Sequence, residues 1–155
     1  MMHSESTQVE NSSRIIWFLT YGVGNDCKRF ADACRRVLLS LGITARDDIR
    51  HMVGSANLRR AHARRVSAMI PKLNDLPDTQ VNPLPGVFRA LLTLIENSND
   101  DVDVYRAVHS VADLVGRQTV ARVLMDELCD RHEEIWYAYR LISAMGYIRM
   151  ALSSL

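Results

Sequence analysis

The segment from Val102 to Gly116 constrains this chain most, because apolar side chains would cover most of its circumference if it were a helix. The apolar residues are Val104, Ala107, Val108, Val111, Ala112, Leu114 and Val115. Polar residues fall in one narrow stripe that includes Arg106, His109 and Asp113. A helix with so small a polar face belongs in the middle of a bundle. The segment therefore predicts a helical domain built around it.

Helical spacing of apolar residues recurs along the rest of the chain. The pattern predicts further helices at residues 26–41, 44–52, 58–73, 87–96, 119–131 and 135–148. Residues 14–21 are apolar enough to form a buried strand, but no second strand-like run exists to pair with them, so we expect a helix there too. Only 6% of the residues are aromatic, and a core of Leu, Ile, Val, Met and Ala favours helices over a sheet. We expect an all-α fold.

The chain is expected to form one ordered domain with a short tail. Residues 1–13 are polar and lack apolar periodicity, which predicts disorder. All four prolines fall between residues 71 and 85, so the segment 74–86 is the main interruption of the helical pattern. We interpret it as a connection rather than a domain boundary, because neither half looks self-sufficient. Residues 14–155 are thus predicted to be a single domain.

Several functional classes find little support in the sequence. No phosphate-binding loop is present, and His109 has no positioned nucleophile beside it in the sequence, so we do not expect an enzyme. Cys129 and His132 could supply two metal ligands, but a buried thiol beside a surface histidine is the simpler interpretation, and we expect no metal or cofactor. The three cysteines show no disulfide spacing and are expected to be reduced.

Charge and hydropathy indicate a soluble cytoplasmic protein. The formal net charge is only +1, which gives no global attraction to nucleic acid or to an acidic membrane. The run Arg59, Arg60, Arg64 and Arg65 could form a phosphate-binding stripe, but it lacks interleaved aromatic residues, so we favour a solvated face or an acidic protein partner. The N-terminus does not look like a secretory signal, and no apolar stretch approaches the ~20 residues of a membrane span. We therefore expect no stable membrane anchor.

Four short segments occur in a set order along the chain, before, within and after the apolar segment 102–116. They are residues 14–21 (RIIWFLTY), residues 64–67 (RRVS) followed by Leu73, residues 88–92 (FRALL) with an acidic loop and then 103–106 (DVYR), and residues 120–123 (VARV) leading to 134–136 (EIW). Their order and spacing resemble the Bcl-2 family of apoptosis regulators, in a short, divergent, virus-encoded form. The family usually carries Asn-Trp-Gly-Arg where this chain has residues 103–106, so only Arg106 is kept. Gly116 lies about where the family's central helix carries glycine, and Trp136 matches a family mark.

The resemblance implies a bundle of about seven to eight helices around a central hydrophobic helix, with a groove that receives a partner's helix. Such a ligand, of the BH-3 type, lays apolar side chains into the groove and offers an aspartate to Arg106. The implied groove residues are Val66, Met69, Leu73, Phe88, Leu91, Ile95, Tyr105, Arg106 and His109. The implied partners are pro-apoptotic BH-3-only proteins of the Bim type and Bax- or Bak-like effectors.

The third homology motif of the family is the least clear here. Residues 49–58 could be its remnant, with Ser55 where an aspartate usually stands. This departure favours a survival protein that receives a helix over a killer that presents one. The expected function is therefore inhibition of apoptosis in the host-cell cytoplasm, with recruitment to mitochondria through partners.

Alternatives to the groove remain at this point. The same fold could act on innate-immune signalling through another surface or through a homodimer. Arg106 could pair with Asp103 or Asp113 or face water, and Leu91 and Ile95 could be ordinary core residues.

Overall fold

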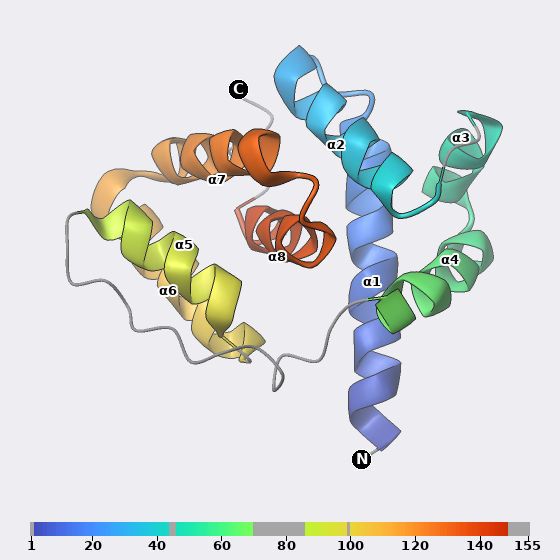
Figure 1. Ribbon diagram of the computed structural model, residues 1–155, viewed down its shortest axis with the longest axis horizontal. Coiled ribbons are helices and arrows are strands. Elements are labelled where there is room, and N and C mark those ends of the chain that lie inside the picture. The colour runs from blue at the N-terminus through green and yellow to red at the C-terminus, as the bar shows by residue number, and fades with distance from the viewer. Residues whose placement is uncertain (1, 44–45, 70–85, 99, 149–155) are drawn as a thin grey trace. The chain divides into compact units, whose positions relative to one another are not determined.

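A computed structural model describes residues 2–43, 46–69, 86–98 and 100–148. Within these ranges the chain forms eight α-helices and no strand, which confirms the all-helical prediction (Figure 1). The helix expected at residues 14–21 is part of α1 (Met2–Gly22).

The chain divides into two compact units, Met1–Ile70 and Pro71–Leu155. The expectation of a single domain, with residues 74–86 as a connection within it, stays a prediction. Most of the proline-containing segment lies outside the described residues.

Unit 1 is organised around α1 (Met2–Gly22). The helices α2 (Lys28–Ser40), α3 (Arg46–Gly54) and α4 (Ala56–Met69) all contact it. Ile16 and Leu19 of α1 are completely buried, and the inner face of α2 is buried through Phe30, Ala33, Cys34, Val37 and Leu38. This apolar interior makes unit 1 a small helical bundle.

The N-terminal residues for which the sequence predicts disorder belong to α1, which begins at Met2. Ser12 and Ser13 are buried, and the Ser12 hydroxyl forms a 2.7 Å hydrogen bond with the hydroxyl of Ser67 on α4. Small hydroxyl side chains let two helices approach closely while each polar group finds a partner. A polar composition therefore concealed a packed helix.

Gly22 ends α1 where α2 comes close to it. A Cβ atom at this position would lie 2.6 Å from Cys34 Sγ and 3.0 Å from the Phe30 ring. Since real carbon atoms essentially never approach a neighbour that closely, the contact between α1 and α2 depends on glycine here.

Unit 2 consists of α5 (Val87–Asn97), α6 (Asp101–Val115), α7 (Arg117–Arg131) and α8 (Ile135–Gly146). Helix α8 contacts the other three and is buried on nearly every side. Its buried residues are Tyr137, Ala138, Tyr139, Arg140, Leu141, Ile142, Ala144 and Met145. Helix α8 thus occupies the central place in this unit.

The sequence placed α6 at the centre of the bundle, and this prediction is wrong. Only Val104, Val108 and Ala112 of α6 are buried, whereas Val102 is 54% exposed and Leu114 is 71% exposed. Its neighbours α5, α7 and α8 cover one side of it and leave the other to solvent. An apolar circumference shows what a helix can bury, but the positions of its neighbours around it decide what it does bury.

The acidic loop before α6 supplies the N-terminal cap of this helix. Asp100 is the N-cap, and its side chain accepts a 2.8 Å hydrogen bond from the backbone N–H of Val102. Such a bond satisfies one of the N–H groups that a helix leaves free at its first turn.

None of the helices among the described residues is both long and apolar enough to cross a membrane.

Candidate helix-binding surface

The predicted groove residues are distributed over both units. Val66 lies on α4 of unit 1 and is completely buried. Met69 is the last residue of α4, and Leu73 lies outside the described residues. The other six predicted residues belong to α5 and α6 of unit 2.

The three predicted groove residues on α5 contribute mainly to the core of unit 2. Leu91 and Ile95 are buried, at 2% and 0% exposure, and Phe88 is half-buried. Side chains this deeply buried are core residues, which is the alternative that the sequence left open for them. A partner helix reaches them only if the side chains that cover them move.

The three predicted residues on α6 lie close together on its exposed side. The rings of Tyr105 and His109 are 4.3 Å apart between centroids, and Tyr105 is 48% exposed. Arg106 is exposed beside them. With Val102 they occupy positions i, i+3, i+4 and i+7, which share one side of a helix. We call Val102, Tyr105, Arg106 and His109 the α6 flank.

Tyr147 completes this aromatic group, and the sequence analysis missed it. Its ring meets Tyr105 edge-on at 5.1 Å, from the residue that follows α8. Burial raises the pKa of the Tyr147 hydroxyl above its ordinary value. No local pattern could have indicated this pairing, because the two tyrosines are 42 positions apart and meet only through the packing of α6 against α8.

The ring of His109 on the α6 flank is partly buried. Its Nε2 atom is buried and has no hydrogen-bond partner among the described residues.

Arg106 is available to an external carboxylate. It forms no ion pair with Asp103 or Asp113, and no hydrogen bond to any other described residue. This removes the alternative that an acid on its own helix neutralises it. An exposed guanidinium next to apolar rings can form a two-pronged bond with a carboxylate of a ligand whose apolar residues cover the rings.

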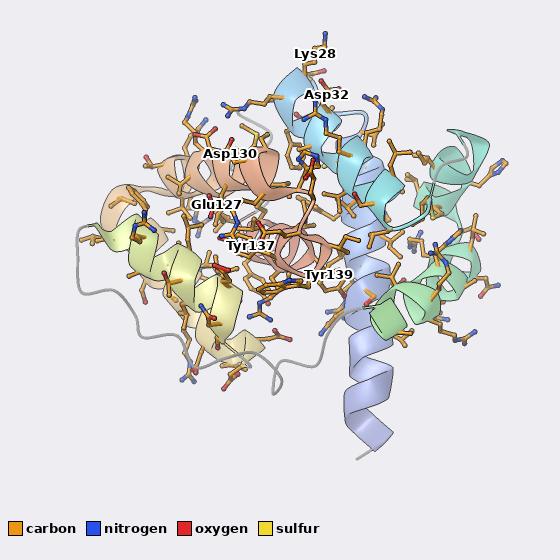
Figure 2. All side chains as sticks on the ribbon, viewed as in Figure 1. Lys28, Asp32, Glu127, Asp130, Tyr137 and Tyr139 are labelled. Atoms are coloured by element: carbon orange, nitrogen blue, oxygen red, sulfur yellow. The ribbon has the colours of Figure 1, made fainter. Side chains whose placement is uncertain are left out.

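A second charged group, centred on Arg131 of α7, is structural. Its guanidinium bonds to the carboxylates of Glu134 at 2.5–2.6 Å and Glu96 at 3.0–3.2 Å, and lies 3.6 Å from Glu127. It also stands 4.2 Å above the ring of Tyr137, whose hydroxyl donates to Glu127 (Figure 2 labels both residues). These partners raise the pKa of Arg131 and join α5, α7 and α8, so the group holds unit 2 together.

The arginine run of α4 is mostly engaged within unit 1. Arg59 donates to the carbonyls of Met52 and Val53 at the end of α3, and Arg65 donates to that of Leu41 at the end of α2. Arg60 lies 3.9 Å from Glu10. The run is therefore not the free phosphate-binding stripe that its sequence alone allows, because two of its four guanidiniums stabilise helix ends.

The described residues contain no group of three or more side chains that could hold a metal ion. The ring of His132, one of the two weak candidates, lies with Nδ1 3.1 Å from the backbone oxygen of Cys129.

Comparison with known proteins finds no family model, curated protein or solved structure that matches the chain.

Proposed function

We propose that this chain is a non-enzymatic binding protein that receives an amphipathic helix of another protein on the α6 flank. One observation carries the proposal: an exposed, unpaired Arg106 stands beside the half-exposed ring of Tyr105 and the exposed side chain of Val102. Apolar side chains next to one fixed charge are the combination that recognises a helix with an apolar face and a single acid.

The ligand class that fits this surface is a BH-3-type helix. Such a helix carries spaced apolar residues and one aspartate, and the resemblance to the Bcl-2 family suggests it independently of the geometry. The aspartate would pair with Arg106, and this charge-assisted contact is worth about 1.5–3 kcal/mol. On this proposal the chain holds pro-apoptotic BH-3-only proteins of the Bim type, and thereby inhibits apoptosis.

The proposed binding surface differs from the groove that the sequence implied. Leu91 and Ile95 are buried in the core of unit 2, so the ligand contacts the α6 flank rather than those side chains. Phe88, half-buried near the beginning of α5, is not part of the flank.

Isothermal titration of the full chain with a panel of BH-3 peptides tests this function. We expect at least one peptide to bind with a Kd below about 1 μM, and Arg106→Ala to weaken it about tenfold, the equivalent of about 1.4 kcal/mol. Arg122→Ala is the matched control, because Arg122 is an exposed arginine on the neighbouring helix α7 and should leave the Kd unchanged. Failure of every peptide to bind would remove the proposal.

A double-mutant cycle then decides whether Arg106 meets the ligand's aspartate. If it does, replacing that aspartate with alanine weakens binding to the native chain but has little further effect on the Arg106→Ala variant. Additive losses would show that Arg106 acts elsewhere. Circular dichroism of each variant confirms that the helices are intact.

A second candidate function is action through a dimer interface of the same chain, as for a viral protein that interferes with innate-immune signalling. The observation that favours it is Leu114, which is 71% exposed on the side of α6 away from the flank, while the predicted groove residues of α5 are buried. Analytical ultracentrifugation separates the two functions. A concentration-dependent dimer that Leu114→Asp abolishes would support this candidate, and a monomer at all concentrations would exclude it.

A further inference from the structure

The outer face of α2 is strongly cationic, and the function proposed above does not use it. Lys28, Arg29, Arg35 and Arg36 are all exposed on this face, and only one acid, Asp32, lies among them. Lys28 and Asp32 are labelled on α2 in Figure 2. Leu39, 49% exposed, is the one large apolar residue of the face. We call these six residues the α2 face.

The opposite side of α2 is firmly anchored. Phe30, Ala33, Cys34, Val37 and Leu38 are exposed by no more than 2%. The helix therefore cannot turn its apolar side toward a membrane without leaving the core of unit 1. What it offers to a partner is a rigid row of charges on a fixed helix.

The position of these charges is unfavourable for the helix itself. Lys28 and Arg29 are the first two residues of α2, where the positive end of the helix dipole repels cations, and the helix has no acidic residue in its first turn. It also has no basic residue in its last turn, where a cation would stabilise it. Residues that oppose the local preference of their helix are expected at functional sites.

Two charged members of the α2 face are engaged: Arg29 has an interaction partner, and Arg35 forms an ion pair with Asp32. Arg35 Nη1 lies 2.9 Å from Asp32 Oδ1. This leaves an excess of positive charge on the face, in a unit whose sequence has 11 Lys and Arg against six Asp and Glu, a formal net charge of +5. The field of the whole unit therefore reinforces the field of the face.

We propose that the α2 face binds an acidic amphipathic helix of a partner protein. The row of cations complements glutamates or aspartates at helical spacing, and Leu39 gives such a helix an apolar contact. Helix α2 has 13 residues and is about 20 Å long, which matches a partner helix of three to four turns. This site lies on unit 1 and is independent of the α6 flank.

Two features favour a protein helix over nucleic acid. The face has no aromatic residue on which bases could stack, and Asp32 interrupts the positive row where a continuous phosphate backbone would pass. Leu39 would be left facing phosphates, whereas a helix can place an apolar side chain opposite it.

Fluorescence anisotropy with the full chain tests the proposal. The probe is a fluorescein-labelled 20-residue helical peptide with glutamates and leucines on one face, and its partner probe has glutamine for every glutamate. We expect the glutamate peptide to bind at least about tenfold more tightly than the glutamine peptide, with an affinity that falls as salt is raised. Equal affinity for the two peptides would overturn the proposal.

Charge reversal locates the site. The double variant Lys28→Glu with Arg36→Glu should lose binding by about tenfold or more. Arg14→Glu with Arg64→Glu is the matched control, because both arginines are exposed in unit 1 and the net charge changes equally. Equal losses in the two variants would show that the general field of unit 1 is responsible and would overturn the assignment to α2.

Two further measurements complete the test. A lysine version of the peptide should bind the reversed variant better than the native chain, which a misfolded variant could not do. A 20-base-pair DNA duplex and a 20-nucleotide RNA are the competing probes. If either binds more tightly than the glutamate peptide and loses affinity in the same variant, the α2 face is a nucleic-acid site and the proposal is wrong.

Discussion

Helices α2 and α4 are both rich in arginine, yet they use it in opposite ways. In α4, Arg59 and Arg65 reach the carbonyl groups that α3 and α2 leave unpaired at their ends. In α2, Arg35 and Arg36 are exposed, and Lys28 and Arg29 occupy the N-terminal turn, where the helix dipole disfavours positive charge. The comparison teaches that a run of arginines indicates a binding surface only where no helix end lies within reach of it.

Unit 2 contains a buried arginine that, like Arg59 and Arg65 of α4, bonds to carbonyl groups at a helix end. Arg140 on α8 donates from Nε to the carbonyl of Ile95 and, at 2.5 Å, from Nη2 to that of Ser98. Both acceptors lie at the end of α5. Burial lowers the pKa of this guanidinium, so its two carbonyl partners are what make the buried charge tolerable.

The largest effect is therefore expected at Arg140. Arg140→Ala should lower the free energy of unfolding by about 2–4 kcal/mol, because it leaves two carbonyls without their donors and empties a buried site. Urea denaturation followed by circular dichroism measures it. A loss below about 0.5 kcal/mol, the range of an ordinary surface substitution, would contradict the capping role.

Arg59 and Arg60 are adjacent residues that separate the two uses of arginine within α4. Arg59→Ala should cost about 1–2 kcal/mol, because two carbonyls at the end of α3 lose a charged donor. Arg60→Ala, which removes only an exposed and long ion pair to Glu10, should cost less than about 0.5 kcal/mol. Similar losses of unfolding free energy in the two variants would show that Arg59 does not stabilise the end of α3 more than an exposed arginine would.

The contribution of the Arg131 group to the stability of the protein should depend on pH. The hydrogen bond from Arg131 lowers the pKa of Glu134 below its ordinary value of 4.5, so this contribution to stability is present above pH 4.5 and is lost as the pH falls through the folded-state pKa. At pH 7 we expect Arg131→Ala to be about 1 kcal/mol less stable than the native chain.

The difference between the two proteins should shrink as the pH is lowered toward 3, since protonated carboxyl groups no longer need Arg131. Urea denaturation at pH 7, 5 and 3 follows it. A difference that is constant over this range would show that Arg131 acts through its packing on Tyr137 rather than through charge.

The smallest expected effect has the opposite sign. Lys28→Glu should stabilise unit 1 by about 0.3–0.5 kcal/mol, because it replaces a cation by an anion in the first turn of α2. Thermal unfolding at low salt is the measurement, with Arg64→Glu as the control. A destabilisation would mean that Lys28 serves the fold, and the contrast between α2 and α4 would narrow.

Local helix formation was predictable from this sequence. The segments 87–96, 102–116 and 119–131 correspond to Val87–Asn97, Asp101–Val115 and Arg117–Arg131, since apolar spacing, Asp100 and the glycines mark helices and their ends directly. The start of α1 was not predictable in this way. Its buried serines gain their stability from α4, which no local pattern records.

The arrangement of helices was less accessible than the helices themselves. The apolar residues around α6 suggested that this helix is central. The polar atoms of α8 gave no sign that α8 is the more deeply buried helix. Tyr137 and Arg140 are buried because Glu127 and two backbone carbonyls accept their hydrogen bonds, and those partners lie on other helices. For the candidate site, the sequence indicated Tyr105, Arg106 and His109 but could not show that the α5 residues are core.

The close approach of Gly22 to Cys34 also has a chemical consequence. Cys34 is completely buried, while Cys27 and Cys129 are partly exposed. An alkylating reagent should therefore modify Cys27 and Cys129 in the folded protein and reach Cys34 only when α2 separates from α1. The rate of that third modification would report the opening of unit 1 alone, so the chain carries its own kinetic reporter for one of its two halves.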